Sequence, residues 1–242
     1  MALAENRILA RLSPEMQQRL ARVLQPVDLE QKQILFEPNQ RIRDVYLPRG
    51  GLCSILSVSP QGESIEVAVI GREGVMGLSA VLGVESVPFR GIMQIAAPAF
   101  RIEADTLAEL AEAHDELRHL LYRYNSALLT QVMQCVACNG LHSVHQRCCR
   151  WLLMAQDRVG ENQLALTHEF LAQMIGVRRA SVSEVLKPLQ DDELIRYRRG
   201  RIEILDRDRL IASSCDCYCI VRDQFQRLLG SEAPTLERAS IH

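Results

Sequence analysis

The sequence predicts an α+β fold with a β-rich N-terminal domain, one long helix and a C-terminal winged helix-turn-helix. Short apolar runs separated by glycine and proline turns fill residues 27–103. A long helical pattern with near-heptad spacing follows from Asp115. Two short amphipathic segments joined at Gly176 then precede a β-like hairpin. The expected divisions of the chain are 1–114, 115–142 and 143–229, with a loose tail at 230–242.

The composition is that of an ordinary globular protein and points to no membrane or secreted class. The chain has 242 residues, of which 48% are hydrophobic and 24% are charged. The formal net charge is −2, but residues 177–201 hold seven Lys or Arg against four Asp or Glu. The N-terminus lacks the basic start and apolar core of a signal peptide, and no apolar run is long enough for a bilayer. We therefore expect a cytoplasmic protein with no membrane partner.

The N-terminal domain is predicted to start with a short helix and continue with strands. Ser13 followed by Pro14 is typical of a helix N-terminus. The runs 53–58 and 64–70 flank the turn 59–62, which is a hairpin signal. Further strands are expected at 45–51, 91–96 and 100–102. Several short strands of this kind indicate a small sandwich or barrel.

Two helices are predicted next, at 106–114 and from 115 to about 139. Apolar residues of the second recur at steps of three and four. This stripe has two interpretations: the helix packs on its own domain, or two copies of it form a dimer seam. We favour the seam, because helix-turn-helix proteins commonly read two half-sites as a two-fold dimer. The expected interface residues are Leu117, Leu121, Tyr124, Leu128, Val132 and Cys135.

The helix-turn-helix is predicted from Thr167 onward, after a helix at 143–158. Thr167 suits the N-cap of a first helix, and Gly176 suits a left-handed turn after it. The second helix has an apolar side and a polar first turn, and Pro188 is expected to kink or end it. Two β-like runs around Arg199 and Gly200 then form the wing, and 206–229 reads as a terminal helix.

This order of parts resembles the Crp/Fnr family of bacterial transcription regulators, which includes the catabolite activator protein. The resemblance covers nearly the whole chain and is most specific across residues 166–205. It implies an N-terminal jelly roll of the cyclic-nucleotide-binding type, called a β-roll. It also implies a dimerisation helix and a hinge near Ser143. The expected partners are double-stranded DNA with a two-fold symmetric site, a second copy of the chain, and RNA polymerase.

The chemistry of the second helix of the motif suits a DNA major groove. Arg179 could place its guanidinium on guanine O6 and N7, while Glu184 could accept from cytosine. Ala180 departs from the family pattern, in which an acidic residue usually follows the arginine, so the usual half-site is in doubt. The other polar groups suit phosphate contacts. The residues expected to contact DNA are Thr167, Gln173, Arg178, Arg179, Ala180, Ser181, Ser183, Glu184, Arg199 and Arg201.

The phosphate-binding turn expected from the resemblance has lost its polar groups. Relatives that bind cyclic AMP carry a glycine followed by glutamate, but here Val75 follows Gly74, and Arg90 lies farther along than the pattern requires. The pocket is therefore expected to be apolar, and either filled by its own side chains or open to a less polar effector. Cyclic AMP is disfavoured, because it would lose its polar partners. The pocket residues are expected to be Gly74, Val75, Met76, Gly77, Arg90, Val132 and Met133.

The eight cysteines are expected to be small core residues, and neither a metal nor a cofactor is predicted. The iron–sulfur relatives carry their cysteines mainly near the N-terminus, whereas this chain has none before Cys53. His142 is expected on a helix surface. No Walker loop, nucleophile elbow or paired-carboxylate motif supports an enzyme. The alternative to a DNA-binding regulator is a ligand- or redox-sensing module that signals through a protein partner, with a metal, an iron–sulfur cluster or thiols as its sensor.

Overall fold

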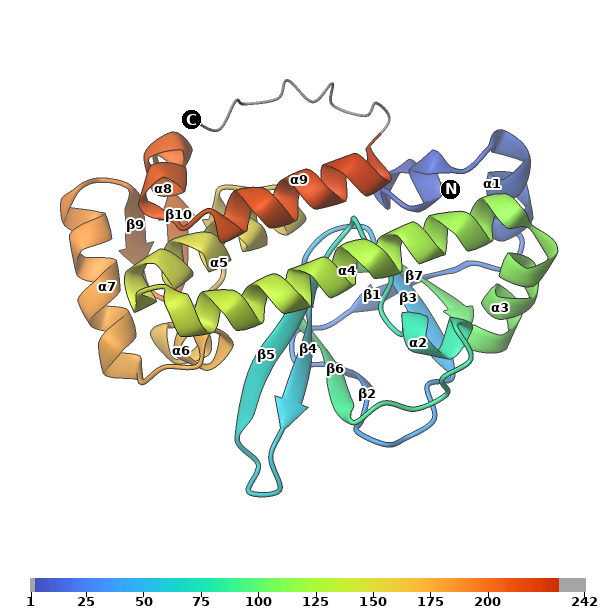
Figure 1. Cartoon of the computed structure of the whole chain (residues 1–242), viewed down its shortest axis with the longest axis horizontal. Coiled ribbons are helices and arrows are strands. Elements are labelled where there is room, and N and C mark those ends of the chain that lie inside the picture. The colour runs from blue at the N-terminus through green and yellow to red at the C-terminus, as the bar shows by residue number, and fades with distance from the viewer. Residues whose placement is uncertain (1–2, 231–242) are drawn as a thin grey trace, which may run out of the picture.

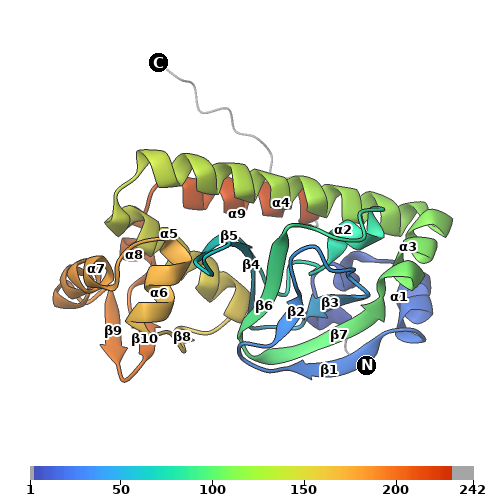
Figure 2. The ribbon, with the colours of Figure 1, turned by 90° about the horizontal axis from the view of Figure 1, so that it is seen from below.

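One long helix, α4 (Asp115–Leu141), runs past both halves of the chain in the computed structural model, which describes residues 3–230. The β-rich half and a helical half lie along it, and the last helix, α9 (Cys217–Leu229), runs beside it (Figures 1 and 2). This confirms the predicted α+β architecture. No helix in the described range is long and apolar enough to cross a membrane.

The N-terminal half begins with the short 3-10 turns Leu3–Glu5 and Leu9–Arg11, followed by helix α1 (Pro14–Ala21). The Ser13 hydroxyl accepts a hydrogen bond from the Met16 amide at 3.3 Å, which confirms the cap predicted from the sequence. Leu20 of α1 is fully buried in the core of the β-rich half.

Two antiparallel sheets make up the β-rich half. One sheet has the order β1-β7-β3, and the other has the order β2-β6-β4-β5. The β4–β5 hairpin joins two neighbours of the second sheet, as the turn at 59–62 predicts. Strands β1 and β2 lie in regions to which the sequence assigned no individual strand. The strand bounds are β1 (Gln25–Leu29), β2 (Ile34–Phe36), β3 (Asp44–Pro48), β4 (Leu52–Val58), β5 (Ser64–Ile70), β6 (Phe89–Ile95) and β7 (Ala97–Glu103).

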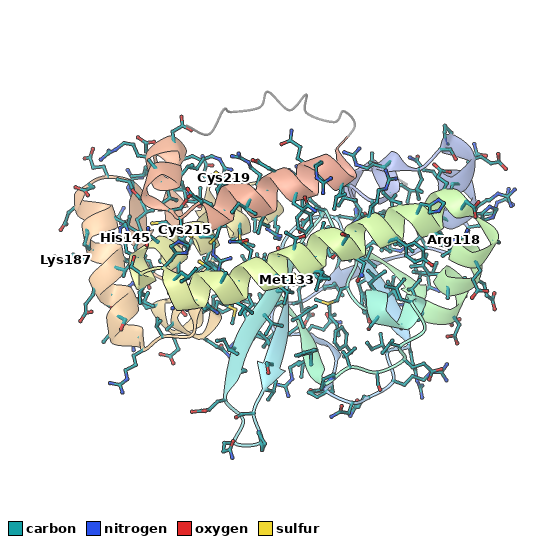
Figure 3. The ribbon with its side chains drawn as sticks, viewed as in Figure 1. Arg118, Met133, His145, Lys187, Cys215 and Cys219 are labelled. Carbon is teal, nitrogen blue, oxygen red and sulfur yellow. The ribbon has the colours of Figure 1, made fainter. Side chains whose placement is uncertain are left out.

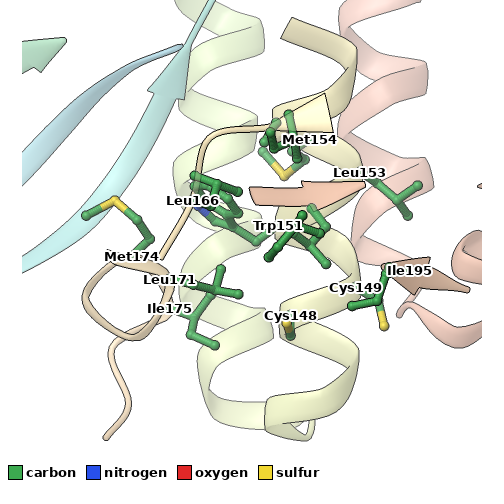
Figure 4. Close-up of a cluster of buried hydrophobic side chains, with 14 of the residues drawn as sticks. Cys148, Cys149, Trp151, Leu153, Met154, Leu166, Leu171, Met174, Ile175 and Ile195 are labelled. Carbon is green, nitrogen blue, oxygen red and sulfur yellow. The ribbon is translucent and has the colours of Figure 1, made fainter. Parts of the chain in front are cut away.

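The helical half is built on α5 (Val144–Val159), which begins at a capping box between Ser143 and Gln146. Its apolar face packs against the helices and the small sheet β8-β10-β9 that follow, and Figure 4 shows this cluster around Trp151 and Leu171. Short connecting helices are α2 (Leu78–Val81) and α3 (Ala104–Ala113). The remaining elements are β8 (Gln163–Leu164), α6 (His168–Ile175), α7 (Arg179–Asp191), β9 (Ile195–Arg198), β10 (Arg201–Ile204) and α8 (Arg207–Ser213).

Two expectations for the C-terminal half are corrected. Helix α7 continues through Pro188 to Asp191, so the proline does not end the helix. The proline removes one backbone hydrogen bond of the helix, and three helical residues follow it. The single terminal helix expected at 206–229 is two helices, α8 and α9, separated by an extended Ser214. The predicted tail lies outside the described residues, apart from Gly230.

The expected dimer seam is also corrected, because its first residues face inward. Leu117, Leu121 and Tyr124 are at most 1% exposed and pack in the core of the β-rich half. Leu128 packs partly against that core as well. Near-heptad spacing correctly identified a continuous apolar stripe, but the chain itself covers its N-terminal part.

Shortening a buried side chain in the core of the helix-turn-helix should destabilise the folded chain. Leu186 of α7 is fully buried, so Leu186→Ala should lower the free energy of unfolding by about 3 kcal/mol through lost contacts and a cavity. Denaturant unfolding followed by circular dichroism measures this change. Lys187→Ala, at the exposed neighbouring position, should stay within about 0.5 kcal/mol. Equal effects of the two substitutions would contradict this packing.

Candidate nucleic-acid interface

The first helix of the motif, α6, begins and ends at the residues that the sequence indicated. The Thr167 hydroxyl accepts a hydrogen bond from the Phe170 amide at 3.1 Å. Gly176 ends the helix in the left-handed region, with φ of +65°. These two local signals define both ends of α6.

The second helix, α7, has one buried and one exposed face. Val182, Leu186 and Leu189 are at most 2% exposed and pack in the core that α5 shares. The opposite face presents polar side chains, and Ser181 is half-buried beside it. The exposed residues of this face are Arg178, which is the N-cap, and Arg179, Ala180, Ser183, Glu184 and Lys187.

His168 of α6 contacts both α7 and the wing. No pattern in the sequence indicated this role. Its Nδ1 lies 2.9 Å from the Ser183 hydroxyl on α7, and its ring lies 4.3 Å from that of Tyr197 on β9. Partial burial, together with the nearby Arg179 charge, holds the pKa of His168 below its usual value. The neutral ring therefore links α6, α7 and the wing, and Ser183 is already engaged within the chain.

The wing is the hairpin of β9 and β10, as the sequence predicts. Arg199 and Gly200 form its turn with φ of +48° and +76°, which is the conformation that two-residue hairpins require. A Cβ placed on Gly200 would lie 3.5 Å from the Thr167 methyl carbon, so the wing turn sits beside the start of α6. Arg199 and Arg201 are exposed, and neither forms an ion pair with a residue of the described chain.

Gln173, which we expected to contact a phosphate, forms a hydrogen bond within the chain in this conformation. Its amide donates to the Ser64 hydroxyl at 2.6 Å, across to the start of β5. A Cβ on Gly176 would lie 2.7 Å from the Ile65 Cδ1 atom, and α6 therefore packs closely on the β4–β5 hairpin. The first helix of the motif is thus one of the contacts between the two halves.

The turn after β5, where the phosphate-binding turn was expected, is filled by the chain itself. Val75 and Met76 are fully buried. The Tyr124 hydroxyl of α4 donates to the Val75 carbonyl at 3.3 Å, and a Cβ on Gly74 would collide with that hydroxyl. Gly77 lies beyond this contact with φ of +89°. Of the two expectations for this region, the structure favours a pocket filled by its own side chains.

Two other residues assigned to the pocket, Arg90 and Met133, do not line it. Arg90 is paired with Glu37 at 2.8 Å. Met133 is 62% exposed and faces away from the core, and Val132 is half-buried. These placements correct the expected pocket, because the helix turns Met133 to the outer face that Figure 3 shows.

A buried ion pair joins the same turn to the helical half. Arg158 of α5 lies 2.9 Å from Glu73, and both side chains are about one-tenth exposed or less. The Arg158 guanidinium also donates to Gln131 of α4 at 2.6 Å, and the Gln131 amide donates to the Val69 carbonyl at 3.0 Å. The turn after β5, the long helix α4 and helix α5 therefore meet at the buried guanidinium of Arg158.

A second polar contact between the halves involves the only tryptophan. The Trp151 indole N–H of α5 donates to the Glu66 carboxylate of β5 at 2.7 Å, and the Ser54 hydroxyl donates to the same carboxylate. Burial raises the pKa of Glu66 to about 7, despite these hydrogen bonds and the nearby Arg150 and Arg158 charges. This carboxyl changes its charge near neutral pH at the contact between the two halves.

Comparison with known proteins places these elements among DNA-binding regulators. Residues 146–213 match the family model of the Crp-like helix-turn-helix domain. The global nitrogen regulator of Synechococcus elongatus is 23% identical over 192 residues, covering 76% of this chain and 86% of that protein.

Solved structures share the fold at low sequence identity. FixK2 from Bradyrhizobium japonicum superimposes with a TM-score of 0.70 at 16% identity, covering 80% of this chain and 98% of that chain. A CRP-family transcriptional regulator from Thermus thermophilus gives a TM-score of 0.63 at 21% identity, covering 78% of this chain and 97% of that chain. The arrangement of β-sheets, long helix and helix-turn-helix is therefore a known one.

The Glu66 contact predicts a titration that Trp151 reports. The folded chain keeps a proton that the unfolded chain releases, so the free energy of unfolding should fall as pH rises from 4.5 to about 7. Above about pH 7 this contribution should stay level. Fluorescence of the single tryptophan should show a transition near pH 7, because the indole hydrogen bond gains a charged acceptor there.

Glu66→Gln should remove the transition while keeping an acceptor for the indole N–H. Glu63→Gln, at an exposed position of the same hairpin, should leave it unchanged. An unaltered transition in Glu66→Gln would assign the titration to another group.

Proposed function

We propose that this chain is a transcription regulator of the Crp/Fnr type, and that it acts as a homodimer that binds a two-fold symmetric DNA site. Its helix-turn-helix is a DNA-binding domain of the Crp-like family. The observation that carries the proposal is the exposed face of α7, which presents Arg179 and Glu184 beside an exposed wing. RNA polymerase is the further partner that we propose for such a regulator.

The two kinds of contact that DNA recognition needs are both available on this surface. Arg179, in the first turn of α7, suits a bidentate contact with guanine in the major groove, and Glu184 suits a cytosine amino group farther along the helix. Arg178, Ser181, Thr167 and the wing suit the phosphates that set the register. Ala180 places a methyl group where the family usually has a carboxylate, so we propose a half-site with a different base at that position.

Dimerisation is proposed through the outer face of α4. Tyr122, Leu129 and Val136 recur at heptad spacing and are 52%, 51% and 69% exposed, and Met133 lies between the last two at 62%. A heptad repeat of exposed apolar side chains is typical of a helix that pairs with another helix. The inner face of α4 is covered by the β-rich half and by α9, which leaves this face for a second copy.

Control of DNA binding is proposed to pass through the contacts of α5 and α6 with the β-rich half. Tyr124 and Val75 occupy the place where a cyclic nucleotide would need polar partners, and Arg90 is engaged by Glu37. We therefore propose that cyclic AMP is not the effector. A signal that alters the Glu66 or Arg158 contacts would change the position of α5, and with it the motif that packs on α5.

Arg179→Ala tests base readout. It should weaken binding to the preferred site by about 1–3 kcal/mol and abolish the preference at one base pair of each half-site. Fluorescence anisotropy with the preferred duplex and its single-base variants measures this.

Arg199→Ala is the matched comparison on the wing. It should weaken all duplexes evenly and reduce the slope of log affinity against log salt by about 1. Arg22→Ala, at an exposed position of the β-rich half, should change neither quantity. If the Arg179→Ala variant binds all duplexes as the unaltered chain does, α7 is not the recognition helix that contacts the bases.

Met133→Glu tests the dimer seam. It should shift the chain toward monomers, since two-fold pairing would bring two carboxylates together at a cost of several kcal/mol. Light scattering across a dilution series measures the dissociation constant. Val23→Glu, at a residue that is 37% exposed and distant in the chain, should leave the dimer intact. A dimer unaffected by Met133→Glu and Leu129→Glu would place the seam elsewhere.

A further inference from the structure

Four side chains that can hold a metal converge at the C-terminal end of α4. They are Cys138 and His142 from α4 and its C-cap, and Cys215 and Cys217 from the link between α8 and α9 and the start of α9. Their ligand atoms all lie within 4.8 Å of one another. Figure 3 labels Cys215 close to where α9 starts, beside the end of α4. From the sequence we expected buried thiols and a surface histidine, and nothing in the spacing indicated this convergence.

The local structure explains why the four meet. Cys138 and His142 are four residues apart at a helix end, and therefore on one side of α4. Cys215 and Cys217 are two residues apart where the chain leaves the extended Ser214 and enters α9. Because α9 packs along α4, both pairs face the same space.

We infer that Cys138, His142, Cys215 and Cys217 bind one Zn²⁺ ion per chain in tetrahedral coordination. Three thiolates and one imidazole are a recognised ligand set for structural zinc. The same ligands favour thiophilic divalent ions over Mg²⁺ or Ca²⁺, which prefer oxygen. Closure of the site by four protein ligands points to a structural ion with no open position for chemistry.

The distances fit a single ion. Zinc–sulfur bonds of about 2.3 Å and zinc–nitrogen bonds of about 2.0 Å place tetrahedral ligand atoms about 3.5–3.8 Å apart. Cys138 and Cys215 Sγ atoms are 3.4 Å apart, as are Cys217 Sγ and His142 Nδ1. An iron–sulfur cluster binds its cysteines through different iron atoms and would need them farther apart.

The surroundings suit the charge of such a site. Three thiolates and one Zn²⁺ carry a net negative charge. The Arg150 guanidinium, 5% exposed on α5, donates to Cys135 Sγ at 3.2 Å and contributes an opposing charge to Cys138. The Gln134 amide donates to Cys217 Sγ at 3.1 Å. Such outer contacts orient metal ligands and hold their charge.

Zinc binding must displace thiol protons. Each cysteine that becomes a thiolate ligand releases its proton to solvent. Zinc affinity should consequently rise with pH.

An ion bound at this position would affect the structure of the chain. It would fasten the end of α4 to the α8–α9 link, directly before Ser143 begins α5. This is the junction between the long helix and the helix-turn-helix half. Zinc would therefore hold the last helix against α4 and stabilise the folded chain.

Metal analysis of the full chain, purified under reducing conditions, tests the inference. We expect one zinc per chain by mass spectrometry. After removal of zinc with a chelator, Co²⁺ should give the visible absorption of a tetrahedral thiolate site. Cys217→Ser should weaken zinc binding by more than about 100-fold, since even substitution of a residue that only supports a metal ligand costs about 10–100-fold. His142→Gln should weaken binding while retaining the sulfur-to-cobalt absorption.

Cys219→Ser is the matched control, because Cys219 lies on the same helix outside the four ligands. It should bind zinc like the unaltered chain, and circular dichroism should show all three variants folded. Four results would overturn the inference: no zinc and no cobalt spectrum; iron with acid-labile sulfide; a Cys138–Cys215 disulfide under reducing purification; or unaltered zinc affinity in both ligand variants. These experiments measure metal content and not DNA binding. A negative result would therefore not count against the DNA-binding proposal, which has its own test.

Discussion

The buried guanidinium of Arg158 constrains the arrangement of the whole chain. A buried cation without a partner is strongly destabilising, so its surroundings must supply charge and hydrogen-bond acceptors. Glu73 supplies the charge at 2.9 Å, while Gln131 and the Met154 carbonyl accept hydrogen bonds. These groups come from the turn after β5, from α4 and from α5. This one side chain therefore takes part in contacts that join the two halves of the molecule.

The same constraint links the β-rich half to the helix-turn-helix half. Helix α5 carries Arg158 near one end and the core of the helix-turn-helix along its length. Trp151 and Glu66 add a second polar contact from the same helix, and α6 rests directly on the β4–β5 hairpin. Packed elements therefore connect the turn after β5 with α7, and no bound nucleotide is part of this connection.

Local signals allowed much of the fold to be predicted from the sequence, whereas contacts between distant residues were the least predictable part. Thr167 and Gly176 define α6 because capping depends on neighbouring backbone groups, and the wing follows from a two-residue turn. The outer face of α4 could not be assigned, because the spacing of Leu117 and Leu121 is the same for a dimer seam and an intramolecular core. Cys138 and Cys215 become neighbours only because α9 folds back along α4. Gln173 and the Glu73–Arg158 pair likewise find their partners through tertiary packing.

The proposal that this chain reads DNA as a two-fold dimer through α7 is the centre of the functional interpretation. Selection of binding sites from a random duplex library by the full-length protein tests it most directly. We expect an enriched palindromic motif with half-sites about one helical turn, or roughly 10 base pairs, apart. Recovery of no motif, or of a single half-site without its symmetric copy, would contradict it.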